Sequence, residues 1–141
     1  MLRLYPPVPF VGRTSTTEST VCELAVPEGS TLCFSPYALG RDPVSWGATA
    51  NDFRPERWLG SGGSTGGAPS SLCWLPFGAG PRGCLGTRLG LTEVVICVAL
   101  LLQRFEPFTF ERAGEGLRYK YDLTLNLEGT ALCEAVVRES S

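Results

Sequence analysis

The chain has 141 residues, of which 43% are hydrophobic and 18% charged, so its composition is that of a folded domain with a packed core. The formal net charge is −2, and the eleven arginines and single lysine form no basic tract, which argues against binding to a nucleic-acid backbone. The six cysteines are widely spaced, with no Cys-x-x-Cys pair and no histidine in the chain, so we expect reduced thiols and no structural zinc site.

The first nine residues lack the charged region, apolar run and cleavage site of a secretory signal. They are typical of the last turn of a helix that Pro6 and Pro7 end. Residues 10–34 then predict a small sheet, with strands at Val21–Leu24 and Thr31–Phe34 joined by a turn.

Residues 35–59 mix proline, tryptophan and charged residues without helical or strand periodicity, apart from a short helix around Asp42–Trp46. We expect a structured meander in which Trp46, Phe53 and Trp58 bury area, because aromatic side chains of this size usually do. Residues 60–71, with the sequence GSGGSTGGAPSS, are low in complexity and predict a flexible surface insertion.

A run of apolar residues from Leu89 to Leu102 predicts a helix that ends at Phe105, before Pro107. The run is short for a bilayer span, and it is apolar on nearly every face, so we expect a helix buried in a core. Short strands are expected beyond it at 108–110, 119–121, 123–127 and 135–137, with glycine turns at Gly114, Gly116 and Gly129.

The segment Phe77–Gly86 lies immediately before this helix and fits the pattern F-x-x-G-x-R-x-C-x-G at every fixed position. A cysteine thiolate on a haem iron pushes electron density toward oxygen, and the start of a helix favours the charged form of the Cys84 sulfur. Arg82 is suited to bind a haem propionate. Glycines let the backbone turn tightly against a flat macrocycle, and four are present: Gly78, Gly80, Gly83 and Gly86. The alternative is that Cys84 is a small buried hydrophobe in a glycine-rich turn.

With this segment the chain resembles the cytochrome P450 family of haem-thiolate proteins. The resemblance implies that Cys84 is the axial iron ligand of haem b, the only metal group expected. It also implies that Phe77, Arg82 and the four glycines line the haem, that Arg13 contacts a second propionate, and that Trp74 covers the ligand-side face.

Two flanking motifs resemble further parts of the same family. Phe53-Arg-Pro-Glu-Arg-Trp resembles its meander motif, and Leu2-Arg-Leu-Tyr-Pro-Pro places Arg3 where an arginine of the family's K helix belongs. The resemblance implies that Arg3 and Arg57 join a glutamate in an ion-pair triad. Taken singly, each would more often be a solvated charge.

The implied fold class is α+β, the C-terminal part of the mainly α-helical P450 fold. It consists of small β-sheet segments, the meander, the cysteine-ligand loop, a long buried helix (the family's L helix) and C-terminal β-hairpins. Residues 1–141 then form one partial P450 domain, in which Pro7–Val11 and the Ala113–Tyr119 hairpin resemble substrate-facing segments.

The resemblance runs from Arg3 to about Val137, well under half of a complete family member. The triad glutamate, the helix that activates oxygen and the N-terminal membrane anchor would precede Met1, so the catalytic residues are unknown. For the full-length parent it implies a monooxygenase that inserts one atom of dioxygen into an apolar organic substrate, takes electrons from a reductase and is membrane-associated or organellar rather than secreted. Arg88 and Arg104 would belong to the face that docks the reductase. Two alternatives remain, a truncated chain without stable haem that acts at most by association, and a haem-thiolate enzyme that rearranges peroxides without a reductase.

Overall fold

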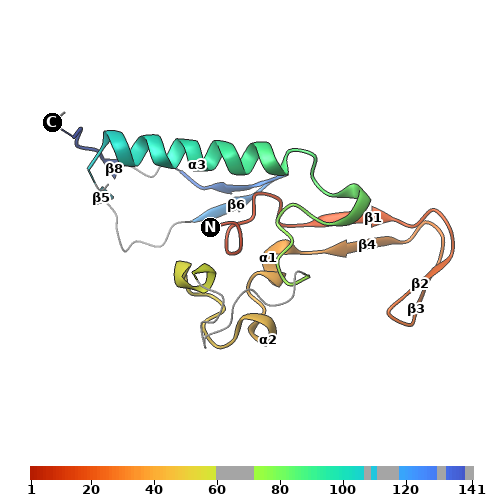
Figure 1. Cartoon of the computed structure of the whole chain (residues 1–141). Helices are drawn as coiled ribbons and strands as arrows, with labels where there is room; N and C mark the ends of the chain where they lie inside the picture. The colour runs from red at the N-terminus through yellow and green to blue at the C-terminus, as the bar shows by residue number, and fades with distance from the viewer. Residues whose placement is uncertain (60–71, 107–108, 111–117, 130–132, 139–141) are drawn as a thin grey trace. The chain divides into compact units, whose positions relative to one another are not determined.

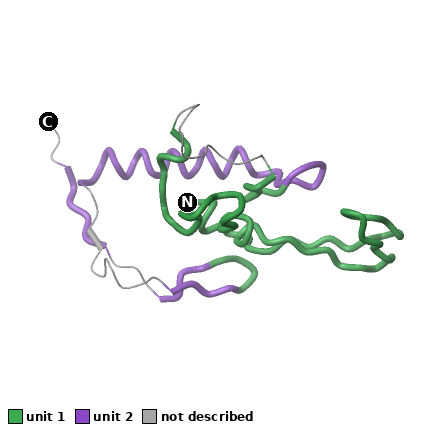
Figure 2. The backbone as a smooth tube through the Cα atoms, turned by 90° about the horizontal axis from the view of Figure 1, so that it is seen from below, with its two compact units in different colours: residues 1–78, 122–125 green, residues 79–121, 126–141 purple. Residues whose placement is uncertain are grey.

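The computed structural model describes residues 1–59, 72–106, 109–110, 118–129 and 133–138. The predicted insertion at 60–71, and all but the end of the hairpin predicted at 113–119, lie outside the described residues. The chain divides into two compact units, residues 1–78 with 122–125 and residues 79–121 with 126–141, called here the first and second units (Figure 2).

The first unit contains a long antiparallel ribbon made of two strand pairs (Figure 1). β1 (Val11–Thr14) pairs with β4 (Thr31–Phe34), with Val11 opposite Phe34. β2 (Ser19–Val21) pairs with β3 (Leu24–Val26) farther along the same ribbon. The prediction of a strand at residues 31–34 is therefore confirmed.

The predicted strand at Val21–Leu24 is wrong, because the chain reverses direction inside it. Cys22 and Glu23 have φ values of 48° and 67° and form the two-residue turn between β2 and β3. Two-residue hairpin turns with two positive φ angles match the twist of the flanking strands, but asparagine and glycine usually occupy them. Cysteine and glutamate are not typical of such turns, so the residue types did not predict a turn at positions 22 and 23.

Two short helices of the first unit begin at prolines and are capped by polar side chains. α1 (Pro36–Leu39) is capped by Ser35, whose hydroxyl accepts a hydrogen bond from the N–H of Ala38 at 3.1 Å. α2 (Pro43–Trp46) is capped by Asp42, whose carboxylate accepts from the N–H groups of Val44 and Ser45, each at 3.1 Å. These caps satisfy donors that a helix leaves unpaired. The helix predicted around residues 42–46 is confirmed.

The core of the first unit surrounds its N-terminal turn, in which the N–H of Tyr5 donates to the carbonyl of Met1 at 3.0 Å. The buried residues there include Arg3, Leu4, Pro6, Gly40, Trp46 and Ala50. The predicted burial is confirmed for Trp46, which is 4% exposed, but wrong for Phe53 and Trp58, which are 63% and 44% exposed. Both belong to the segment around η1 (Pro55–Trp58), which lies at the edge of this small core.

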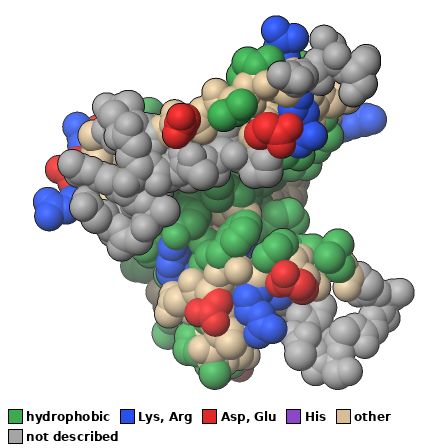
Figure 3. Space-filling model, turned by 90° about the vertical axis from the view of Figure 1, so that its left-hand side faces the viewer, with side chains coloured by type: hydrophobic (Ala, Val, Ile, Leu, Met, Phe, Trp, Pro, Cys, Tyr) green, Lys and Arg blue, Asp and Glu red, His purple; other side chains and the backbone are tan. Residues whose placement is uncertain are grey.

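The second unit is dominated by α3 (Thr87–Arg104), which ends at the extended residue Phe105 as predicted. The prediction that this helix is buried is wrong, because the side chains from Leu91 to Arg104 are all exposed. Within the described residues of its own unit, α3 is accompanied only by a three-residue 3-10 turn and by strands of two or three residues, which are too short to cover an 18-residue helix. Hydrophobic side chains also reach the surface on the face drawn in Figure 3. No helix in the described part of the chain is long and apolar enough to cross a membrane.

The remaining four strands form two small sheets of two strands each. β5 (Thr109–Phe110) pairs with β8 (Cys133–Glu134), and β6 (Tyr119–Tyr121) pairs with β7 (Leu125–Leu127). The strand predicted at 119–121 is confirmed, the one near 125 is shorter than predicted, and the one at 135–137 is displaced to β8. The strand predicted at 108–110 is found at both of its described residues, 109 and 110. Gly129 has a φ of 85°, as a glycine turn requires.

Candidate functional site

The segment before α3 is a tight turn that requires glycine at two positions. η2 (Gly80–Arg82) is closed by the N–H of Gly83, which donates to the carbonyl of Gly80 at 3.0 Å. Gly80 has a φ of 69°, in the region that favours glycine. A Cβ at Gly83 would lie 3.2 Å from the carbonyl oxygen of Gly80, closer than an ordinary contact. The backbone of this turn is therefore bare of side chains at the positions that the sequence analysis singled out.

Cys84 follows this turn and lies two residues before Gly86, the N-cap of α3. Its side chain is exposed, and its carbonyl accepts a hydrogen bond from the hydroxyl of Thr87 at 2.8 Å. The alternative that Cys84 is a buried hydrophobe is therefore wrong. Gly86 brings no side chain to the first N–H groups of α3, which point along the helix axis toward its start. An exposed sulfur at this position can reach a ligand outside the chain.

The other predicted haem contacts are divided between the two units. Arg82, Gly83, Cys84 and Gly86 lie with Gly80 in the second unit, and Arg82 is exposed at the end of η2. Phe77 and Gly78 lie in the first unit, where the N–H of Gly78 donates to the carbonyl of Leu75 at 3.1 Å and Gly78 has a φ of 71°. Arg13 also lies there, on β1, with an exposed side chain that donates to the carbonyl of Gly12 at 2.8 Å.

Arg3 is the most deeply buried charged residue described, at 5% exposure. Its guanidinium donates to the carbonyls of Gly40 and Ala50, each at 2.5 Å, and of Asp52 at 2.7 Å. Burial lowers the pKa of Arg3 from its usual value, the guanidinium groups of Arg57 and Arg41 lower it further, and the charge of Asp52 acts in the opposite direction.

Arg57 is bound in the same way, by carbonyl and hydroxyl oxygens. It donates to the carbonyl of Trp46 at 3.2 Å and to the carbonyl and hydroxyl of Thr49 at 2.6 and 2.5 Å. Its Nε is buried and has no hydrogen-bond partner among the described residues. The two arginines that the resemblance joined in a triad thus lie in one unit and influence each other electrostatically, and no described carboxylate forms an ion pair with either.

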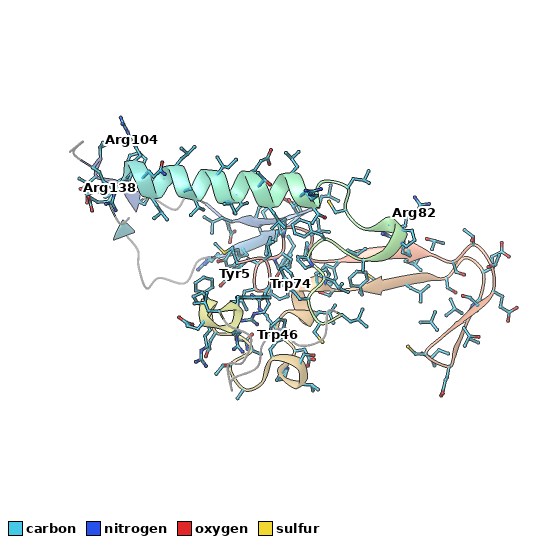
Figure 4. All side chains as sticks on the ribbon, viewed as in Figure 1. Tyr5, Trp46, Trp74, Arg82, Arg104 and Arg138 are labelled. Atoms are coloured by element: carbon cyan, nitrogen blue, oxygen red, sulfur yellow. The ribbon has the colours of Figure 1, made fainter. Side chains whose placement is uncertain are left out.

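A cluster of three tryptophans adjoins these arginines, and sequence reasoning missed it. The ring of Trp58 lies between the other two, with centroid distances of 6.1 Å to Trp46 and 5.0 Å to Trp74. Figure 4 labels Trp46 and Trp74, which both belong to the first unit. The indole N–H of Trp46 donates to the carbonyl of Leu39 at 2.8 Å, whereas that of Trp74 is buried without a partner among the described residues. No spacing in the sequence signals this cluster, because the 58–74 contact spans the segment at 60–71.

A pocket of the first unit opens beside the N-terminus, with a volume of about 70 Å³. It is lined by Met1, Arg3, Leu4, Phe53, Arg54, Pro55 and Trp58. Sites for drug-sized ligands measure about 300–1,000 Å³, so this pocket is too small for a haem or an apolar organic substrate.

Comparison with known proteins assigns the chain to a family. The family model described as cytochrome P450 matches residues 1–124. The chain belongs to the cytochrome P450 family. This P450 chain is 41% identical to cytochrome P450 714A2 of Arabidopsis thaliana over 104 residues. The matched residues make up 74% of the chain and 19% of the relative. It is 38% identical over 133 residues to cytochrome P450 704C1 of Pinus taeda, which covers 93% of the chain and 25% of the relative.

A third relative, cytochrome P450 52A10 of Candida maltosa, is 40% identical over 116 residues, which cover 74% of the chain and 21% of the relative. This P450 chain therefore spans only about a fifth to a quarter of the length of the curated relatives it matches. Membership of the family implies the P450 fold, of which the chain contributes small sheets and few helices, and a haem cofactor.

The donor groups of this P450 chain fit such a cofactor. Cys84 offers an exposed thiol, the turn beside it presents backbone without side chains at Gly80 and Gly83, and Arg82 offers an exposed guanidinium. A soft sulfur for iron, bare backbone for a flat ring and a guanidinium for a carboxylate are the groups that haem binding requires.

Proposed function

We propose that this P450 chain is the haem-binding part of a haem-thiolate monooxygenase, with the Sγ of Cys84 as the axial ligand of haem b. The observation that carries the proposal is the exposed Cys84 thiol between a glycine turn and the N-terminus of α3. When bound, the haem supplies oxygen activation and the transfer of one oxygen atom to an apolar organic substrate. The electrons come from a reductase that docks on the whole protein.

The residues of the chain have separate tasks in this proposal. Cys84 provides the sulfur ligand, two residues before the N-cap of α3. Gly80 and Gly83 hold the turn in a shape that lets a planar ring approach the backbone. Arg82 and Arg13 are the proposed partners of the two haem propionates, because a guanidinium binds a carboxylate through two hydrogen bonds.

In this proposal Arg3 and Arg57 stabilise the fold and do not contact the haem or the substrate. Their guanidinium groups join the carbonyls of residues 40, 46, 49, 50 and 52 into one hydrogen-bonded cluster, which fixes the segment after α1 and α2. Completion of the cluster by a glutamate from the preceding part of the P450 fold is a proposal that the family pattern supports.

The test is a reduced carbon-monoxide difference spectrum of the purified chain with added haem. We expect the red-shifted band of a thiolate-ligated haem in the wild type and its loss in Cys84→Ser. Cys97→Ser is the matched control, because Cys97 is also an exposed cysteine and lies on α3, outside the signature. A band that survives in Cys84→Ser would refute the assignment of the ligand.

A second candidate is a non-catalytic chain that binds no stable haem and acts by association. The exposed apolar length of α3 favours it, because surfaces of this kind usually mark association sites. A wild-type chain that gives no thiolate band, and that forms oligomers at micromolar concentration, would decide for this candidate.

A third candidate is a reductase-independent enzyme that rearranges peroxides. It shares Cys84 and the haem with the leading proposal and differs in needing no electron donor. Turnover of an organic hydroperoxide by the full-length protein without reductase, together with no turnover of substrate with dioxygen and reductase, would select it.

A further inference from the structure

The three tryptophans of the first unit differ in how well each can carry a positive charge. Their rings are in series, with centroid distances of 6.1 Å between Trp46 and Trp58 and 5.0 Å between Trp58 and Trp74. Indole is the side chain from which an electron is removed most readily after thiolate and phenolate. Rings this close exchange an electron rapidly, so a charge placed on one of them moves to the ring that holds it best.

Trp46 is the least suitable of the three. The guanidinium carbon of Arg3 lies 4.8 Å from its ring centroid, and the side chain is only 4% exposed. A cation over the ring stabilises the neutral, electron-rich indole and repels an indole radical cation. Burial adds to this, because water cannot solvate the new charge.

Trp74 and Trp58 differ in where the indole proton can go. An oxidised indole becomes a long-lived neutral radical only after it loses its N–H proton. The Nε1 of Trp74 is buried and has no acceptor among the described residues, so no described group can take its proton. Trp58 is 44% exposed, so water can accept its proton and solvate its charge.

We infer that Trp74 and Trp58 form an electron relay in which Trp58 is the terminal donor to a high-potential one-electron oxidant. The oxidant gains one electron from Trp74, Trp58 passes one electron to Trp74, and Trp58 releases its N–H proton to water and remains as a neutral indolyl radical. The relay would carry oxidising equivalents away from the interior. Its natural oxidant, haem-derived, rests on the proposed function, whereas the relay itself does not.

The test delivers a photochemical oxidant at one end of the relay, without haem. A ruthenium polypyridyl complex is attached to Cys73, the neighbour of Trp74, in the full chain with its other five cysteines replaced by serine. After flash oxidation, transient absorption measures the neutral indolyl radical, and peptide mass spectrometry locates the oxidised tryptophan. Because Cys84 is one of the five cysteines replaced by serine in this variant, failure of the relay and failure of the haem assignment are independent results.

We expect oxidation products at Trp58 to exceed those at Trp46 by about thirtyfold, the ratio that a desolvated cation–π contact of about 2 kcal/mol implies. Trp74→Phe should lower the yield at Trp58 several-fold, because it removes the intermediate ring and keeps an aromatic side chain in its place. Trp46→Phe should leave that yield unchanged. Equal yields at Trp58 with and without Trp74, or products mainly at Trp46 or Trp74 in the parent chain, would overturn the inference.

Discussion

The guanidinium carbon of Arg3 lies 4.8 Å from the ring centroid of Trp46, and these two side chains form the centre of the first unit. Arg3 comes from the N-terminal turn and Trp46 ends α2, so the contact ties the start of the chain to the meander. The carbonyls of Gly40, Ala50 and Asp52 complete the shell around the guanidinium. A charge is thus the organising element of a core with few buried apolar residues.

Replacement of Arg3 by methionine is expected to destabilise the first unit by about 3 kcal/mol, because buried carbonyls would lose their donors. The free energy of unfolding measured in urea checks this. Arg88→Met is the control, since Arg88 is exposed on α3 and should change stability little. Equal stability of the two variants would mean that the hydrogen bonds of Arg3 contribute nothing net.

Gly40→Ala is expected to be more damaging than Gly47→Ala, although Gly40 has an ordinary helical φ of −67°. A Cβ at Gly40 would lie 2.0 Å from the carbonyl oxygen of Arg3, so backbone would have to move, at a cost of about 3 kcal/mol. At Gly47 the space is open, and only its backbone angles, φ 75° and ψ −173°, oppose alanine, because they lie in a region that almost only glycine adopts, at a cost of about 2 kcal/mol. Thermal unfolding of both variants tests the order, and a reversed order would contradict the packing around Arg3.

Gly90→Ala is expected to stabilise α3 by about 1 kcal/mol, because alanine has less backbone freedom to lose in a helix than glycine. The site is open, since a Cβ there meets no atom within 4 Å. Amide hydrogen exchange of residues 91–100 should slow in the variant. Unchanged or faster exchange would indicate that the position is needed as glycine for a contact outside the described residues.

Asp42 makes the stability of α2 depend on pH. The hydroxyl of Ser45 and the N–H groups of Val44 and Ser45 donate to its carboxylate and lower the pKa of Asp42 below its usual 3.8. The stabilisation is therefore complete above the pKa of the unfolded carboxyl and disappears as the pH falls through the lower folded value. We expect Asp42→Asn to reduce the melting temperature at neutral pH and to flatten its decline in acid. If the melting temperatures of wild type and Asp42→Asn fall in parallel as the pH is lowered, Asp42 makes no such contribution.

The exposed apolar surface of α3 predicts association of the chain. Val95 and Leu102 lie seven residues apart on one face of the helix and are 67% and 59% exposed. Their joint replacement by glutamate should lower the binding of a hydrophobic fluorescent dye and reduce the apparent mass in solution, because it divides the apolar surface. If the variant binds the dye and associates as the wild type does, the surface through which the chain associates lies outside this face of α3.

The sequence by itself indicated the family, the candidate ligand Cys84 and the C-terminal end of α3. These depend on local information, namely ten consecutive residues of a fixed pattern and an apolar run between a glycine and a proline. It also placed Arg3 and Arg57 together, but only through the resemblance, since a charged side chain alone says nothing of its partners.

Only the tertiary structure decided which side chains are buried and which groups they contact. Arg3 is buried on three carbonyls, Trp58 and Trp74 meet across a long stretch of chain, and α3 is exposed although its composition is that of a core helix. The physical reason is that burial is a property of what surrounds a residue. An apolar composition shows that a helix can be buried. Whether it is buried depends on whether another layer of structure packs against it.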